Sequence, residues 1–89
     1  MISKTVTIVN KLGLHARAAA KFVELASRHV SHIEVEANGR KVNGKSIMGV
    51  MMLAASQGTE IQLHVDGPDD KEATGHLIEL IANKFDEDE

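Results

Sequence analysis

Residues 10–17, Asn-Lys-Leu-Gly-Leu-His-Ala-Arg, decide how this chain of 89 residues folds. Gly13 allows a turn, and the alanine-rich run that follows as far as Ser27 strongly prefers helix. His15 therefore stands at a helix start, with Arg17 in the first turn. The first backbone amides of a helix have no partner within it, and the helix dipole adds partial positive charge there. The stretch predicts a place where an anion is stabilised.

On both sides of this stretch, apolar residues recur with the period of strands or of helices. The Asn38-Gly39 pair between two alternating segments predicts a hairpin, so at least one pair of strands is antiparallel. Strands are predicted at residues 3–9, 33–37, 40–43 and 60–65, and helices at 16–27, 47–55 and from Asp69 to Lys84. This order, βαββαβα, predicts a two-layer α/β (α+β) sandwich in which helices cover one face of a sheet.

The composition fits one small domain spanning residues 1–89. Cysteine is absent, which excludes disulfides and thiolate metal sites, and we expect no cofactor in so small a core. We also expect neither a signal peptide nor membrane insertion, which favours a cytoplasmic protein. The formal net charge is −3, but residues 86–89 are all acidic, and we expect this tail to be flexible and solvated.

The positive charges concentrate between Lys11 and Lys45, which suits a phosphate or an acidic protein partner. Nucleic-acid binding usually requires a strong basic patch and often stacking aromatics. Phe22 and Phe85 are the only aromatic residues, so a small nucleic-acid-binding domain is the weaker alternative.

The helix start at His15 suits phosphoryl chemistry. The free amides of Ala16, Arg17 and Ala18 could reach a phosphoryl group on the imidazole ring, and the Arg17 guanidinium could add a charge-assisted contact. The positive helix end favours the neutral imidazole, which is the nucleophile. Because no Walker-type loop and no nearby acids for magnesium are present, another protein rather than ATP would supply the group. The alternative is that His15 only caps the helix and Arg17 is a solvated charge.

Two stretches, Gly13–Arg17 and Lys45–Met51, together with the element order, resemble the histidine-containing phosphocarrier (HPr) family of the bacterial phosphoenolpyruvate-dependent phosphotransferase system. The resemblance covers essentially the whole chain. It implies an antiparallel four-stranded sheet of order 1-4-2-3 with three helices on one face. It also implies that phosphorylated enzyme I donates to the Nδ1 atom of His15, with help from Arg17, and that a IIA component receives the group. Such a protein is a phosphoryl carrier and not a stand-alone enzyme, and we expect a monomer.

The chain departs from this family at Ala18, where a proline is common. Alanine keeps the N–H that proline lacks, so we expect the function to survive. The acidic ending at 86–89 resembles the nitrogen-related branch of the family and leaves the pathway open. A regulatory interaction module of that branch, with a silent His15, is therefore an alternative.

Ser46 is a good N-cap for the short helix that follows it. The resemblance implies, in addition, a regulatory phosphoserine at this position, made by an HPr kinase/phosphorylase where the organism has one. Phosphate is tolerated at a helix start, so we expect it to weaken the docking of acidic partners rather than the helix.

We expect a small apolar patch beside His15, rimmed by Arg17 and other cations, as a transient docking surface. Ordinary packing of flexible methionines is the alternative. The docking residues are predicted to be Ile47, Met48, Met51, Lys21 and Lys45.

Four further histidines, His29, His32, His64 and His76, are predicted to be solvated surface residues. A metal site formed by His29 and His32 is disfavoured, because the pair spans a helix end and a strand start with no carboxylate or thiol near in sequence. We therefore predict no metal site.

Overall fold

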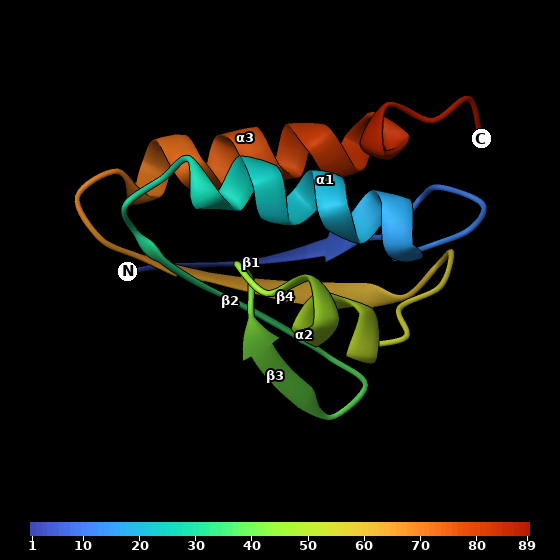
Figure 1. Cartoon of the computed structure of the whole chain (residues 1–89). Helices are drawn as coiled ribbons and strands as arrows, with labels where there is room; N and C mark the ends of the chain where they lie inside the picture. The colour runs from blue at the N-terminus through green and yellow to red at the C-terminus, as the bar shows by residue number, and fades with distance from the viewer.

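A computed structural model describes all 89 residues of the chain. Its elements are β1 (Ile2–Thr7), α1 (Ala16–Ser27), β2 (His32–Ala37), β3 (Arg40–Asn43), α2 (Ile47–Met52), β4 (Glu60–Asp66), α3 (Asp70–Ala82) and a short 3-10 turn, η1 (Lys84–Asp86). Figure 1 shows α1 and α3 side by side in one layer over the sheet, with α2 beside α1. No helix combines the length and the apolarity needed to cross a bilayer.

The four strands form one fully antiparallel sheet of order β1-β4-β2-β3. β4 lies between β1 and β2, with Ile61 opposite Val6 and Leu63 opposite Val35. The predicted sandwich and the strand order that the family resemblance implies are both confirmed.

The core lies between the inner face of the sheet and the helices. Alternate residues of β2 and β4 are buried, as their period of two predicts. From the helices, the core receives one stripe of α1 and the inner face of α3. The buried side chains of these four elements are Ile33, Val35, Ala37, Ile61, Leu63, Val65, Ala18, Ala19, Phe22, Val23, Ala26, Ala73, Thr74, Leu77 and Ile81.

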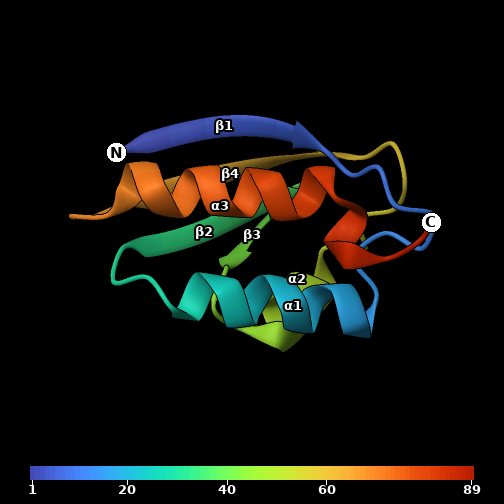
Figure 2. The same ribbon diagram turned by 90° about the horizontal axis from the view of Figure 1, so that it is seen from above.

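α1 and α3 run in opposite directions, which is plain when the molecule is seen from above (Figure 2). The start of α1 and the end of α3 therefore lie at the same end of the molecule. The end of α1 and the start of α3 lie together at the other end. At each end of this helix pair, residues that are distant in sequence therefore lie close together.

The last helix ends at Ala82, two residues before its predicted end at Lys84. Lys84, Phe85 and Asp86 have positive φ angles of 58°, 55° and 63°. Such a left-handed conformation costs non-glycine residues about 1–2 kcal/mol each. Burial of the Phe85 ring offsets part of that cost, being worth roughly 1.5–3 kcal/mol. The turn reverses the chain, so the C-terminal residues return beside the loop that precedes α1 (Figures 1 and 2).

Candidate functional site

His15 is the N-cap of α1. Its backbone is extended, with φ −73° and ψ 177°, and its carbonyl accepts the first hydrogen bond of the helix, from the Ala19 amide at 2.8 Å. The imidazole ring makes no capping bond to the helix, which corrects the view of His15 as a mere cap. The ring is half-buried and is held in place by other groups.

Gly13 positions the loop before His15. Its φ is +66°, and a Cβ on it would lie 2.4 Å from the Ala55 carbonyl oxygen, closer than any side chain tolerates. The same carbonyl accepts a hydrogen bond from the Leu14 amide at 2.8 Å. The loop is therefore pressed against the segment that follows α2, and only glycine fits there.

The first three amides of α1, those of Ala16, Arg17 and Ala18, have no hydrogen-bond partner in the structure. They are the donors that the sequence predicts for an anion beside His15. Arg17 is exposed and pairs with no carboxylate, so its guanidinium is available as well. The predicted group of donors therefore exists at this helix start.

The acidic tail is not solvated throughout, and this prediction is wrong at Glu87. The Glu87 side chain is 14% exposed, and its Oε2 atom accepts a hydrogen bond from His15 Nε2. Its Oε1 atom accepts from Asn10 Nδ2 at 3.0 Å, and that buried amide also donates to the Gly13 carbonyl at 2.9 Å. Glu87 and Asn10 are functional candidates that the sequence reasoning missed, because the docking of Glu87 depends on the turn at Phe85.

Two ion pairs, one on either side of Glu87, join the C-terminal residues to the rest of the chain. Lys21 Nζ lies 3.3 Å from Asp86, and Lys11 Nζ lies 3.1 Å from Glu89. The sequence did contain a signal for this contact, because the segment that begins at Lys11 is basic and the C-terminal residues are acidic. Tail, loop and α1 together line a shallow pocket that contains both His15 and Arg17.

The contact with Glu87 determines which nitrogen of His15 keeps a free lone pair. Desolvation alone raises the pKa of Glu87, but hydrogen bonds from Asn10 and His15 and the charge of Arg17 outweigh it and lower that pKa below its usual range. The carboxylate is then ionised at neutral pH and can only accept, so His15 Nε2 must carry the proton. In the neutral ring, Nδ1 therefore holds the free lone pair. Nδ1 has no hydrogen-bond partner in the structure.

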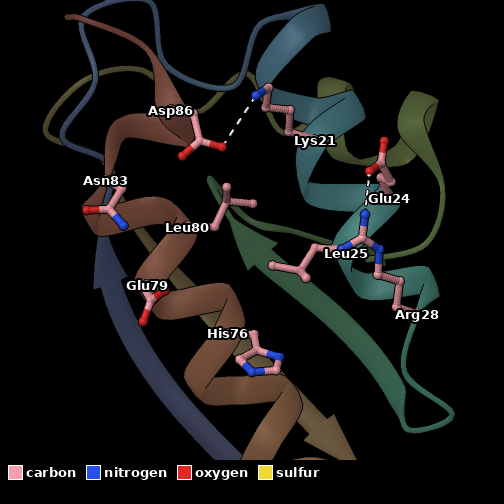
Figure 3. Close-up of a pocket in the computed structure, with 9 residues that line it drawn as sticks. All are labelled: Lys21, Glu24, Leu25, Arg28, His76, Glu79, Leu80, Asn83 and Asp86. Atoms are coloured by element: carbon pink, nitrogen blue, oxygen red, sulfur yellow. Dashed lines mark hydrogen bonds and ion pairs between the residues drawn. The ribbon is translucent and has the colours of Figure 1, made fainter.

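A second groove, between α1 and α3, is a less suitable site for an anion (Figure 3). Its cations are already paired: Lys21 with Asp86, and Arg28 with Glu24 at 2.8 Å. Glu79 adds a further negative charge to its wall. The free positive charge lies at the start of α1 instead.

Ser46 caps α2 as predicted, since its Oγ accepts a hydrogen bond from the Gly49 amide at 3.1 Å. Val50 is the buried residue of this short helix, and Met48 is 74% exposed. Ile47 and Met51 are also exposed, so an apolar surface of α2 faces solvent.

Of the two lysines predicted at the rim of that surface, Lys21 extends from α1, whereas Lys45 does not lie beside His15. Lys21 lies one helical turn after Arg17. The Lys45 ammonium donates to the His29 carbonyl at 2.7 Å, just beyond the far end of α1 from His15. A buried backbone carbonyl at a helix end attracts a cation, which explains the direction of this side chain.

The predicted exposure is correct for His32 and His76 and wrong for His29 and His64. His29 is 7% exposed and its Nδ1 atom lies 2.9 Å from the Asp69 carboxylate. His64 bridges Ser3, at 3.0 Å, and Glu36, at 3.1 Å. Both rings lose water because carboxylates from distant parts of the chain replace it.

Comparison with known proteins agrees with this geometry. The family model described as the PTS HPr component phosphorylation site, where PTS is the phosphotransferase system, matches residues 2–83. The chain belongs to the HPr family. It is 55% identical to the phosphocarrier protein HPr of Cupriavidus necator over 89 residues, covering 100% of both chains. It is 52% identical to the HPr of Neisseria meningitidis, again over 100% of both.

Solved structures of the family have the same fold. HPr from Thermoanaerobacter tengcongensis superposes with a TM-score of 0.95 at 49% identity, covering 100% of both chains. HPr from Bacillus anthracis gives a TM-score of 0.86 at 41% identity, covering 90% of this chain and 95% of the other. The chain is thus a phosphocarrier of the phosphotransferase system, a carrier of a phosphoryl group rather than a catalyst.

Proposed function

We propose that His15 Nδ1 accepts a phosphoryl group from phosphorylated enzyme I and passes it to a IIA component. The observation that carries this proposal is the difference between the two ring nitrogens of His15. Glu87 holds the Nε2 proton, while Nδ1 has no partner; the first three amides of the helix that His15 begins are unpaired, and Arg17 lines the same pocket.

In the forward step, the Nδ1 lone pair attacks phosphorus. The bond from phosphorus to the donor protein breaks, and its electron pair stays on the donor. The ring of His15 then carries positive charge as long as Nε2 keeps its proton, and the Glu87 carboxylate stabilises that charge. The amides of α1 and Arg17 stabilise the phosphoryl oxygens. Onward transfer reverses these steps on the acceptor.

The exposed apolar residues of α2, together with Arg17 and Lys21, form the proposed docking surface for enzyme I and the IIA component. Small apolar areas beside positive charge suit transient, acidic partners, because charge steers the encounter and the apolar area is buried on contact. Lys45 does not belong to this surface, since its ammonium is bound at the other end of α1.

Regulation through Ser46 is part of the same proposal, with an HPr kinase/phosphorylase as the modifying protein. The hydroxyl of Ser46 is at a helix start, where added negative charge is tolerated. The added charge would lie on α2, next to the exposed Ile47 and Met48. It would therefore weaken the docking of acidic partners while the helix persists.

The remaining expectations are a cytoplasmic location and a monomer. A dimer of HPr from Thermoanaerobacter tengcongensis and a swapped dimer of Crh from Bacillus subtilis have related folds, so the oligomeric state is a separate question. Size-exclusion chromatography with light scattering would answer it for this chain. The names of the relatives give no support to a regulatory module with a silent His15.

Mass spectrometry tests the carrier proposal directly. After incubation with phosphoenolpyruvate and enzyme I, the protein should gain one acid-labile phosphate. His15→Ala should gain none, and His32→Ala, which changes an exposed histidine elsewhere, should gain one. The His15 change should leave the fold intact, because the ring makes no helix cap. Phosphate on the His15→Ala protein would overturn the proposal, and so would an unmodified wild type.

A further inference from the structure

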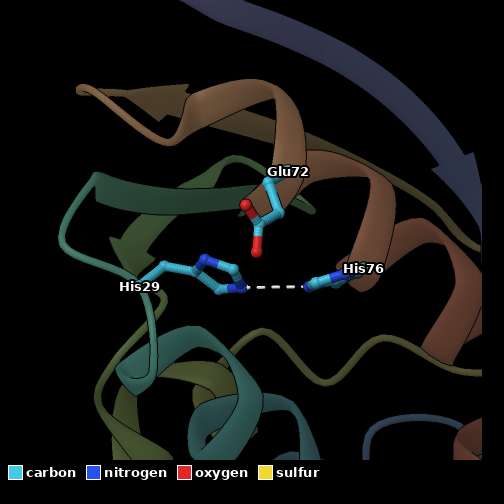
Figure 4. A group of neighbouring side chains, drawn as sticks. All are labelled: His29, Glu72 and His76. Carbon is cyan, nitrogen blue, oxygen red and sulfur yellow. Dashed lines mark hydrogen bonds between the residues drawn. The ribbon is translucent and has the colours of Figure 1, made fainter.

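The end of the molecule opposite His15 holds a second group of chemically active side chains. His29 follows the last turn of α1, and Glu72 and His76 lie one turn apart on α3. Figure 4 shows the Glu72 carboxylate directed toward the gap between the two imidazole rings. One ligand atom from each of the three residues lies within 4.8 Å of the other two. The phosphoryl carrier mechanism uses none of them.

The spacing of the two nitrogens matches that of two ligands on one ion. His29 Nε2 lies 3.2 Å from His76 Nδ1, and the rings are tilted by 48°. Ligands about 2.0–2.1 Å from a tetrahedral Zn²⁺ ion lie roughly 3.3 Å from each other. Small ring movements suffice to place an ion between these atoms. Glu72 is exposed and has no hydrogen bond or ion pair, so its carboxylate is free to complete the set.

Asp69 contacts His29 in the way that a carboxylate commonly contacts a metal-binding histidine, at the ring nitrogen that faces away from the ion. The Asp69 carboxylate lies 2.9 Å from His29 Nδ1, and is fixed by the backbone amides of Val30 and Ser31 at 3.2 and 3.0 Å. Because a carboxylate accepts, His29 Nδ1 carries a proton and Nε2 presents its lone pair to His76 and Glu72. A carboxylate behind the histidine is the usual second partner in such sites. This contact is the independent observation that points to a ligand.

We propose that His29 Nε2, His76 Nδ1 and the Glu72 carboxylate bind one divalent transition-metal ion, with Zn²⁺ as the best fit. Two imidazoles and one carboxylate are typical Zn²⁺ ligands, whereas Mg²⁺ prefers oxygen alone. A water molecule fills the fourth position, since Glu72 and His76 are exposed. On binding, the proton that His76 Nδ1 shares with His29 moves through solvent to His76 Nε2, so no net proton is released.

The charges at this end of the molecule permit such an ion. Glu72 and Asp69 together balance the two positive charges. The nearby cations are already occupied, Lys45 by the His29 carbonyl at 2.7 Å and Arg28 by Glu24 at 2.8 Å. The ion would link the end of α1 to α3 and stabilise their packing. His29 and His15 are separated by the whole of α1, about 20 Å, so the ion would not touch the transferred group.

Calorimetric titration of the chelator-treated full chain with ZnCl₂, and separately with MgCl₂, tests the site. We expect one Zn²⁺ per chain, no response to Mg²⁺, and a melting temperature that rises with Zn²⁺ concentration. Glu72→Gln and His76→Gln should each weaken binding by roughly tenfold or more. His32→Gln is the matched control, because this exposed histidine lies outside the group, and it should bind as wild type does.

Histidine ring NMR gives the location of the ion. Zn²⁺ should shift the ring signals of His29 and His76 and leave those of His15 unchanged. Both α3 variants change exposed positions, so circular dichroism should show an intact fold. Absence of Zn²⁺ binding would overturn the proposal. Equal affinity in wild type, Glu72→Gln and His76→Gln would overturn it as well, and would indicate adventitious binding elsewhere.

Discussion

At the scale of single residues, two carboxylates determine what two histidines can do. Glu87 accepts from Nε2 of His15 and leaves Nδ1 with an unshared lone pair. Asp69 accepts from Nδ1 of His29, so Nε2 of that ring carries a lone pair and faces His76. The same residue type thus sets opposite tautomers at the two ends of α1, because the carboxylate approaches from opposite sides of the ring.

Glu87→Gln tests the role of the first carboxylate. The amide has nearly the same shape but lacks the charge that stabilises the phosphorylated ring. A hydrogen bond to a charged group is worth about 1 kcal/mol more than a neutral one, so phosphorylation of His15 should slow roughly fivefold. Glu89→Gln, which changes an exposed tail residue paired with Lys11, is the control and should transfer at the wild-type rate. Rates that are equal in all three proteins would show that Glu87 plays no part.

At the scale of elements, the starts of α1 and α2 serve different purposes. α1 begins at a residue whose ring makes no capping hydrogen bond, so the first amides of the helix stay free for an anion. α2 begins at Ser46, whose hydroxyl occupies one amide, and it exposes its apolar side chains to solvent. The first helix start suits the transferred group, and the second suits docking and its regulation.

Ser46→Asp tests the second helix start. Asp is as good a cap as Ser, so the free energy of unfolding should change by less than about 1 kcal/mol. The added charge should raise the KM of enzyme I for this protein several-fold, because it repels an acidic partner. Ser46→Asn keeps the cap without the charge and should behave as wild type does. Transfer kinetics that are identical for Asp and Asn would contradict the charge mechanism.

The sequence predicted the fold well wherever local pattern controls structure. The alternation in residues 33–37, the Asn38-Gly39 hairpin and the stripe on α1 all have the predicted form. The helix start at His15 was likewise predictable, since it depends on Gly13 and the alanines that follow.

What could not be predicted depends on contacts between distant residues. A run of acids is normally solvated, but the left-handed turn at Phe85 brings Glu87 to His15, which is 72 residues away. His29 meets Asp69 and His76 across 40 and 47 residues, and no local period reports such contacts. Lys45 was misplaced for the same reason, since its partner is the carbonyl at the end of α1.

At the scale of the whole molecule, the antiparallel arrangement of α1 and α3 brings both groups of side chains together. It brings the end of the chain to His15 at one end, and the start of α3 to His29 at the other (Figure 2). The tail consequently packs against the start of α1, and we expect its attachment to depend in part on the ionisation of Glu87.

Acid should therefore release the tail. The folded state lowers the pKa of Glu87 from its usual 4.5, so its contribution to stability is fully present above that value and is lost as pH falls through the lowered pKa. The difference in melting temperature between wild type and Glu87→Gln should be constant near neutral pH and shrink toward zero in acid. A difference that stays the same from neutral pH into strong acid would show that the charge of Glu87 does not hold the tail.

We propose that Nδ1 of His15 carries the phosphoryl group while Nε2 keeps its proton. Nitrogen-15 NMR of the ring, recorded after phosphorylation by enzyme I and phosphoenolpyruvate, tests it most directly. We predict phosphorus coupling to Nδ1 of His15 and a protonated Nε2. Coupling to Nε2, or to a nitrogen of any other histidine, would contradict the account.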